Sequence, residues 1–285
     1  MTPMSAETTA PQAEADPHPF FTQLSELLSR IKIAGGVTVF FFAFFFIFEP
    51  KPFTFAGMTL IYPYPGLFTS FSSEFFDMMR AQLLPPQMIL INLNSFDAFT
   101  ASVYTAAVLA LIPSMPVWVY ELGGFVGPAL TPKEKKTIQY LLMPASLLFL
   151  AGVVFAYWVV LPILFRFLYY FILAFNALPT ISIMSFVTMV LAYMIAMGLA
   201  FELPIVIVGL TYVGLVSYST WFHYWRHAVV GAFFIALVIS PPGATGGIIE
   251  ISIGLLLSAL YLIGAAVARF IELRRKSSIY PLTSE

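Results

Sequence analysis

Long apolar runs recur along this 285-residue chain, and they limit its fold more than any other feature. A helix rises 1.5 Å per residue, so about 20 residues cross the roughly 30 Å hydrocarbon core of a membrane. Only 9% of the residues are charged, against roughly 25% in soluble domains, so water cannot solvate the folded surface. We predict an all-α integral membrane protein with six transmembrane helices, at about 33–48, 98–120, 138–161, 186–213, 228–240 and 248–267.

The third apolar run is ambiguous, because it continues to Phe175 and could hold one span or two. Loops on the cytoplasmic side of a membrane collect Lys and Arg, so these residues distinguish the alternatives. With six spans, ten of the 13 Lys and Arg residues fall on the inner side, whereas splitting the third run leaves five there and eight outside. We therefore expect both termini to be cytoplasmic, with a disordered tail at 1–19, the membrane domain at 20–270 and a second tail at 271–285.

Two further segments have the pattern of helices that do not cross the membrane. In Phe20–Ile31, apolar residues recur at intervals of three and four, which predicts an amphipathic helix leading into the first span. Gly66–Leu84 carries a similar pattern between flanking prolines, which predicts a helix outside the membrane. The fifth span is shorter than the hydrocarbon core, so the bilayer must thin there or neighbouring helices must tilt.

The residue content argues against an enzyme. The chain has no cysteine, which excludes a disulfide framework, thiol catalysis and cysteine-bound metal. His223 and His227 have the spacing of two metal ligands, but without a third ligand their Trp and Tyr neighbours favour an aromatic segment at the membrane surface. No nucleophile, metal cluster or acid pair is visible, so we predict no catalytic, cofactor-binding or metal-binding residue.

Three stretches carry recognisable motifs. The run Phe125–Lys136 (FVGPALTPKEKK) has the form F-x-x-P-A-L-x-x-x-E-[RK]-[RK], and Phe201–Val206 (FELPIV) has the form F-E-x-P. Val230–Phe234 (VGAFF) precedes the turn Ser240–Pro242. In this order, the motifs resemble the first inside loop, the fourth span and the short fifth span of the TatC family. Members of that family are multi-spanning receptor subunits of the twin-arginine protein translocase. The resemblance covers most of the chain and implies six spans with both ends in the cytoplasm.

The chain also departs from the family pattern. Its N-terminal segment only partly matches H-L-x-E-L-R-x-R, because Gln23 replaces the His and Leu28 replaces the first Arg. Near the last two spans, residues unusual for the family stand at Gly243, Glu250 and Leu262. The resemblance therefore implies a divergent member, and an archaeal source is one alternative that the sequence leaves open.

Two acidic residues are candidates for recognising a positively charged partner. By chemistry alone, Glu134 is a solvated loop charge that pairs weakly with neighbouring lysines. The resemblance implies instead that Glu26 and Glu134 bind the paired arginines of a twin-arginine signal peptide. A carboxylate matches a guanidinium with two parallel hydrogen bonds, which a lysine cannot reproduce. Arg30 competes locally for Glu26, and Glu121, at the end of the second span, is interpreted as an interfacial charge.

Glu202 lies near the middle of the fourth span among apolar neighbours. An unpaired charge there costs at least about 2.5–3.5 kcal/mol on insertion scales. One interpretation is an uncharged carboxyl that bonds a neighbouring helix; the other is a functional site. The resemblance implies that this site docks single-span subunits similar to TatA or TatB. The alternative is a small proton- or cation-coupled secondary transporter with Glu202 as its relay, which would need a partner charge or a broken-helix site.

We therefore expect the receptor and core subunit of a machine that exports folded proteins. Its implied partners are TatA- or TatB-like subunits, twin-arginine signal peptides of folded precursors and membrane lipid. We expect a multi-pass protein of the cell membrane in an oligomeric complex, with no cofactor and no nucleic acid.

Overall fold

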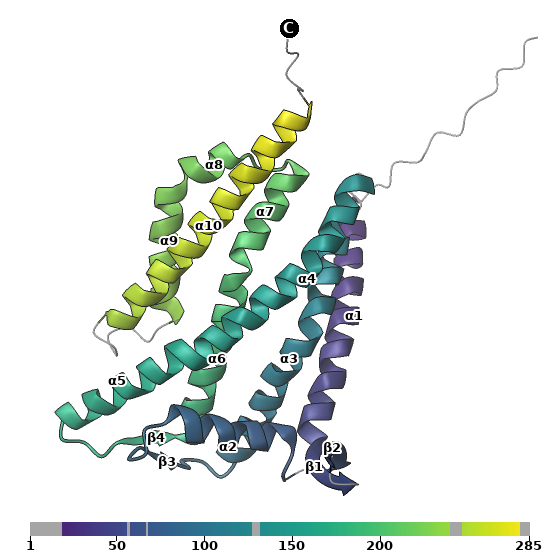
Figure 1. Cartoon of the computed structure of the whole chain (residues 1–285). Coiled ribbons are helices and arrows are strands. Elements are labelled where there is room, and N and C mark those ends of the chain that lie inside the picture. The colour runs from purple at the N-terminus through teal and green to yellow at the C-terminus, as the bar shows by residue number, and fades with distance from the viewer. Residues whose placement is uncertain (1–18, 56–57, 67, 127–131, 240–246, 280–285) are drawn as a thin grey trace, which may run out of the picture.

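The computed structural model describes residues 19–55, 58–66, 68–126, 132–239 and 247–279, most of which are helical (Figure 1). Within these ranges, five helices are long and apolar enough to cross a membrane: Gln23–Ile47, Asp97–Phe125, Met143–Ala174, Ile183–Val213 and Ile249–Arg274. A further apolar helix, Trp225–Ile239, has only 15 residues. We predicted an all-α membrane protein with six spans. A mainly helical chain with several helices able to cross a membrane is confirmed, whereas the strands described below were not predicted.

The helices are numbered in chain order and labelled in Figure 1. They are α1 (Pro19–Ile47), α2 (Phe71–Leu83), α3 (Asp97–Val126), α4 (Pro132–Phe155), α5 (Leu161–Ala174), α6 (Ile183–Phe201), α7 (Leu203–Val213), α8 (Tyr218–His223), α9 (Trp225–Ile239) and α10 (Ile248–Ile279). The described residues also form four strands. β1 (Phe48–Phe55) and β2 (Met58–Pro65) form an antiparallel hairpin, and β3 (Ile89–Ile91) pairs in parallel with β4 (Thr180–Ser182).

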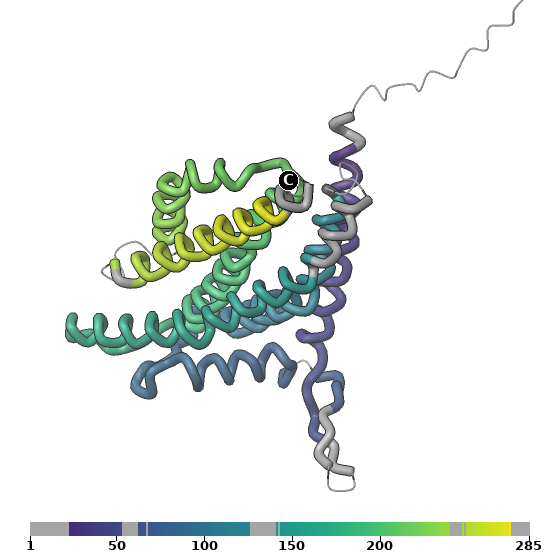
Figure 2. The backbone as a smooth tube through the Cα atoms, turned by 45° about the horizontal axis from the view of Figure 1, so that its top comes forward, coloured from purple at the N-terminus to yellow at the C-terminus, as the bar shows by residue number. Residues whose placement is uncertain are grey.

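The third apolar run forms one continuous helical segment. A π-helical turn, Ala156–Val160, joins α4 to α5, and Pro162 lies in the first turn of α5. Proline has no N–H and its ring crowds the carbonyl four residues earlier, and the wider π turn just before it relieves that crowding. The last turns of α5, which ends at Ala174, project from the bundle (Figures 1 and 2).

The helix predicted at Gly66–Leu84 begins later, at Phe71, and lies across one end of the bundle as α2 (Figure 1). Glu74 stands in its first turn and Arg80 in its last, which are the charges that the helix dipole favours at each end. Two prolines after Leu84 disfavour further helical turns.

A hairpin that the sequence analysis did not predict follows α1 and projects from the bundle (Figures 1 and 2). It contains four prolines, at alternate positions of each strand: Pro50, Pro52, Pro63 and Pro65. Proline has no backbone N–H, so it is tolerated at strand positions whose N–H would point away from the partner strand. At the base of the hairpin, Glu49 accepts a hydrogen bond from Thr69 and pairs with Lys51 at 2.7 Å.

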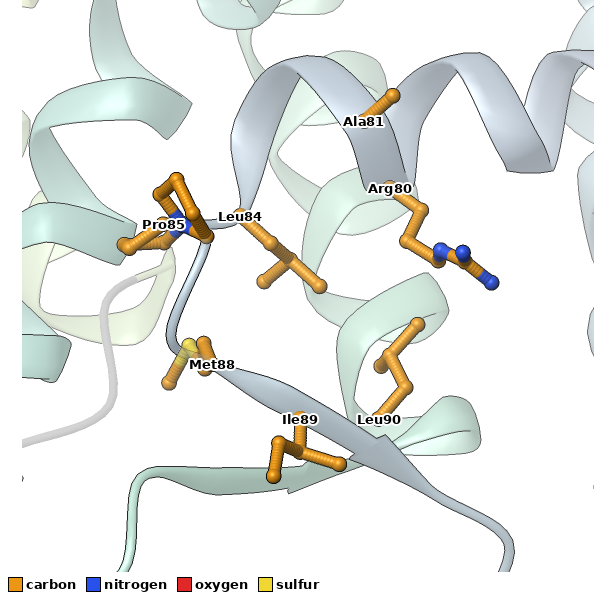
Figure 3. Close-up of a pocket in the computed structure, with 8 residues that line it drawn as sticks. Arg80, Ala81, Leu84, Pro85, Met88, Ile89 and Leu90 are labelled. Carbon is orange, nitrogen blue, oxygen red and sulfur yellow. The ribbon is translucent and has the colours of Figure 1, made fainter.

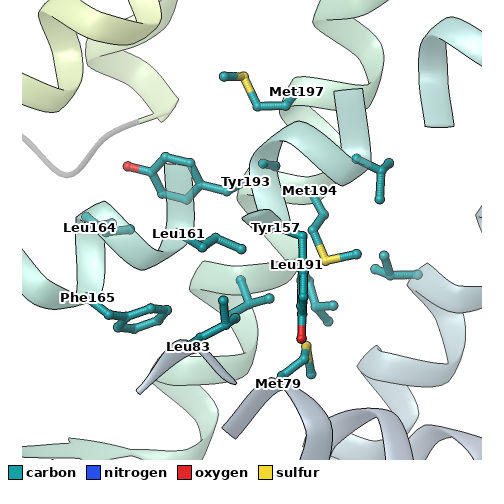
Figure 4. Close-up of a cluster of buried hydrophobic side chains, with 14 of the residues drawn as sticks. Met79, Leu83, Tyr157, Leu161, Leu164, Phe165, Leu191, Tyr193, Met194 and Met197 are labelled. Atoms are coloured by element: carbon teal, nitrogen blue, oxygen red, sulfur yellow. The ribbon is translucent and has the colours of Figure 1, made fainter. Parts of the chain in front are cut away.

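The buried core lies where α2, α5 and α6 meet. Figure 4 shows Met79 and Leu83 of α2 beside side chains of α5 and of α6, from which come Leu161, Leu164, Phe165, Leu191 and Met194. Helices α4 and α6 approach closely, because a Cβ atom added to Gly152 would collide with the Met197 backbone. Small residues at such crossings let helix backbones approach each other in membranes.

A cavity of about 470 Å³ opens between the end of α2 and β3 (Figure 3). Arg80, Leu84 and Met88 are among the residues that line it. It lies at the same end of the bundle as α2, whereas Glu26 lies in the first turns of α1, at the other end (Figure 1). None of the predicted site residues lines this cavity.

Candidate functional site

Glu26 lies on α1 one helical turn before Arg30. This spacing places both side chains on one face of the helix. The Arg30 Nη2 and Nε atoms donate to Glu26 Oε1 at 2.8 and 3.1 Å. Arg30, which the sequence analysis named as a local competitor for Glu26, is therefore bound to it in the structure.

Arg30 also reaches a second carboxylate, on a different helix. Its Nη1 lies 3.4 Å from Oε2 of Glu121 on α3, a residue that is only 9% exposed. A Cβ atom on Gly124 would collide with Nη1, so the missing side chain leaves the space that the guanidinium fills. One cation therefore joins the acids of α1 and α3.

The sequence analysis treated Glu121 as a simple interfacial charge and missed this contact. Arg30 and Glu121 are 91 positions apart in the chain, so no local sequence pattern could have indicated their contact.

A polar contact deeper in the bundle sets the register between α1 and α3. Thr38 Oγ1 accepts from Trp118 Nε1 at 2.9 Å and lies 3.0 Å from Ser114 Oγ. Arg30 is about two turns from Thr38 on α1, and Glu121 about two turns from Ser114 on α3. Because the two helices run in opposite directions, this register brings Arg30 opposite Glu121 (Figure 1).

Glu134 lies in the first turn of α4, and its side chain is outside what the structure describes. Its backbone position is informative nonetheless. Residues 127–131 are all that join Val126 of α3 to Pro132 of α4. Glu134 is therefore at the same end of the bundle as Glu26 and Glu121.

Glu202 interrupts the fourth apolar run, as the single residue between α6 and α7. Pro204 has no N–H to donate to the carbonyl of residue 200, so the regular pattern breaks here. The Glu202 N–H bonds the Leu199 carbonyl at 3.1 Å, and the Glu202 carbonyl accepts from Val206 at 3.0 Å. The chain direction is kept across the break (Figure 1).

One oxygen of the Glu202 carboxyl lacks a hydrogen bond. Its Oε1 atom is buried and has no hydrogen-bond partner within the described part of the chain. The bond to a neighbouring helix, one of the two interpretations above, is thus not seen for this atom. Helix α10 packs tightly here, since a Cβ on Gly264 would lie 2.8 Å from Pro204 Cα. A buried polar atom left unbonded is costly, so Glu202 has an unused hydrogen-bonding capacity.

His223 and His227 are both exposed, and each makes an edge-to-face contact with the Tyr224 ring, at centroid distances of 4.9 and 5.7 Å. Among the residues that the structure describes, no group of three or more His, Cys, Asp or Glu side chains is arranged to hold a metal ion. The aromatic interpretation of this segment fits its geometry.

Comparison with known proteins gives consistent matches over most of the chain. The family model for Sec-independent protein translocase protein (TatC) matches residues 22–249. The TatC protein of Cenarchaeum symbiosum is 34% identical, over 79% of this chain and 85% of its own length. That of Escherichia coli K12 is 31% identical, over 60% of this chain and 67% of its own.

Two solved structures have the same fold. A crystal structure described as the twin arginine translocase receptor TatC is 26% identical, with a TM-score of 0.68. It covers 87% of this chain and 98% of its own. A second, in DDM, is 25% identical with a TM-score of 0.69, over 86% of this chain and 99% of its own. Sequence motifs, fold and relatives agree, and the chain belongs to the TatC family of Sec-independent protein translocase proteins.

Proposed function

We propose that this protein is the receptor and core subunit of a twin-arginine translocase. It binds the signal peptides of folded precursor proteins at one membrane surface and assembles with single-span subunits in the bilayer. One observation carries the recognition step: Glu26 already binds a guanidinium, at the end of the bundle where Glu134 lies in the first turn of α4. The protein takes part in transport and is not an enzyme.

In this proposal, Glu26 and Glu134 each receive one arginine of the cargo. Glu26 is suited to this role because its side chain is 38% exposed, so a peptide can reach it from water. The planar guanidinium offers parallel donors that fit a carboxylate, whereas an ammonium group offers a single point of charge. Recognition should therefore favour paired arginines over paired lysines.

The second site in this proposal is at Glu202, which docks TatA- or TatB-like helices. The Oε1 atom supports this role because it has no hydrogen-bond partner in the described chain. It is buried, but the Glu202 residue is only half-buried, and a rotation of its carboxyl would present the atom to a polar side chain of an added helix. Interhelical hydrogen bonds in membranes contribute about 0.6–2 kcal/mol, enough to choose a face without making the contact permanent. The short α9 lies beside α10, and its 15 residues cover only about 22 Å. A thinned bilayer there would favour docking of a partner helix.

The proposal includes six spans, with α9 as the fifth, in the cytoplasmic membrane. Both termini lie in the cytoplasm, with 1–19 and 271–285 as tails of the membrane domain 20–270. The distribution of Lys and Arg supports this orientation. The hairpin and α2 then lie outside, and α8 lies inside.

Cysteine labelling tests the orientation without background, because the chain has no native cysteine. Ser95 and Ser219 are both exposed, on opposite sides in the proposed topology. In intact cells, an impermeant maleimide should label Ser95→Cys and leave Ser219→Cys unlabelled until the membrane is opened. Labelling of Ser219→Cys from outside would refute the six-span arrangement.

Peptide binding tests the receptor role. The unmodified protein, reconstituted in lipid nanodiscs, should bind a fluorescent twin-arginine signal peptide at least tenfold more tightly than its twin-lysine counterpart. The ratio follows from losing about 1.4 kcal/mol of charge-assisted hydrogen bonding. Fluorescence anisotropy gives both affinities. Equal affinity for the two peptides would exclude the proposed recognition.

A further inference from the structure

Arg30 is a guanidinium that the chain itself supplies to the carboxylates at this surface. It uses three nitrogens, two on Glu26 of α1 and one on Glu121 of α3. The two acids differ in environment: the Glu26 side chain is 38% exposed and that of Glu121 only 12%. A ligand from water can thus reach Glu26, whereas Glu121 is nearly enclosed.

We infer that Arg30 and Glu121 act in cargo recognition as an exchange pair, an inference that rests on the proposed receptor function. Without cargo, Arg30 occupies Glu26. An arginine of the signal peptide takes its place on Glu26, and Arg30 moves to Glu121, which holds it while the cargo is bound. Glu121 is then a positioning residue that does not touch the peptide.

The geometry allows this exchange without backbone movement. Both carboxylates are within reach of one guanidinium, at 2.8 Å for Glu26 and at a longer 3.4 Å for Glu121. A small rotation of the Arg30 side chain would shorten the second contact while it breaks the first. Because Gly124 has no side chain, Nη1 of Arg30 already lies beside α3, on the side of Glu121.

The charges favour it as well. The three side chains together carry one net negative charge, which an incoming guanidinium neutralises. A nearly buried Glu121 needs a cation in both states, because an uncompensated buried charge is strongly destabilising. Moving Arg30 to Glu121 leaves every charge paired once the cargo arginine is on Glu26.

The exchange also contributes to selectivity. A ligand must displace an arginine that already makes two hydrogen bonds to Glu26. A guanidinium can replace both bonds, but an ammonium group cannot match their geometry. Arg30 therefore raises the affinity for Glu26 that a ligand needs in order to bind, and a lysine does not reach this affinity.

Binding of the twin-arginine peptide to the full chain in nanodiscs tests the exchange. In Arg30→Gln the competitor is gone, so the peptide should bind about threefold more tightly, the scale of one exposed ion pair. The twin-lysine peptide should gain more, which lowers the ratio between the two. Arg30→Lys, which keeps the charge, should change both affinities in the same direction but less. Arg226→Gln, a matched change at an exposed arginine on α9, should leave both affinities unchanged.

The role of Glu121 requires a double-mutant cycle. Glu121→Gln alone should weaken peptide binding about threefold, because Arg30 then stays on Glu26. In the Arg30→Gln background the same change should have no effect. A loss that persists in the double variant would show direct contact with the peptide, and Arg30→Gln that weakens binding would show that Arg30 only orients Glu26. Either result overturns the exchange.

The same measurements separate the exchange from the receptor function. If the unmodified protein binds both peptides with equal affinity, the proposed receptor function is wrong. If it prefers the twin-arginine peptide and the Arg30 and Glu121 variants have the same affinities as the unmodified protein, only the exchange is wrong.

Discussion

Glu202→Ala should abolish most protein export, whereas Glu202→Gln should retain a substantial part of it. The motivating observation is a buried Oε1 atom with no partner in the described chain, at the break between α6 and α7. An uncharged carboxyl both donates and accepts a hydrogen bond, and a carboxamide keeps both capacities. Alanine keeps neither, so a partner helix loses its polar contact, worth about 0.6–2 kcal/mol in a membrane.

The measurement is export of a twin-arginine reporter, together with cross-linking to a TatA-like helix. Leu199 and Val206 flank Glu202 by about one turn and are 55% and 51% exposed, so cysteines there report on a docked helix. Cross-links should persist in the Gln variant and disappear in the Ala variant. Thr188→Ala is a suitable control, because that exposed hydroxyl donates to carbonyls of its own helix, at Met184 and Ser185. Oε1 makes no hydrogen bond in the described chain, so Glu202→Ala breaks none at that atom. The amount of each variant in the membrane is measured beside export, so that loss of protein is distinguished from loss of docking.

The transporter hypothesis makes the opposite forecast. A proton relay must release its proton, and a carboxamide cannot, so Gln would be as inactive as Ala. Loss of activity in Glu202→Gln with intact cross-links would therefore reject docking and favour the relay.

The double variant Glu26→Gln/Glu134→Gln should bind a twin-arginine peptide about tenfold more weakly or worse. A Glu–Arg pair at 4 Å gains up to roughly 4 kcal/mol at an effective dielectric constant of 20. Exposure to water reduces this to about 1 kcal/mol for each pair. Two such losses exceed the about 1.4 kcal/mol that corresponds to tenfold. Glutamine keeps the shape and hydrogen-bonding capacity of glutamate, so the change isolates the effect of charge.

Titration of the same fluorescent peptide into nanodiscs gives the affinities. The twin-lysine peptide, which binds weakly from the start, should hardly change. Glu74→Gln/Asp77→Asn removes two exposed acids from α2 at the opposite end of the bundle, and it should bind like the unmodified protein. Undiminished affinity of the Glu26/Glu134 variant would remove these residues from the recognition site.

Local regularities explain why much of the architecture was predictable. Apolar runs identify membrane helices, because each helix that crosses the bilayer must by itself be long enough and apolar enough. The lead-in Phe20–Ile31 merges into α1, and the third run is one segment, as the distribution of Lys and Arg had favoured. The proline-rich hairpin was not predicted, because its four prolines disrupt the alternating pattern by which strands are identified.

The sequence by itself determined the membrane class, the family and the residue types at Glu26, Glu134 and Glu202, because those depend on hydrophobicity and on short motifs. Only the tertiary structure decided that Arg30 joins Glu26 to Glu121 and that Oε1 of Glu202 is left without a partner in the described chain. Arg30 and Glu121 are 91 positions apart, and their contact depends on the register in which α1 packs against α3. That register follows from Thr38, Ser114 and Trp118 and from the missing side chain of Gly124, which no local pattern reveals.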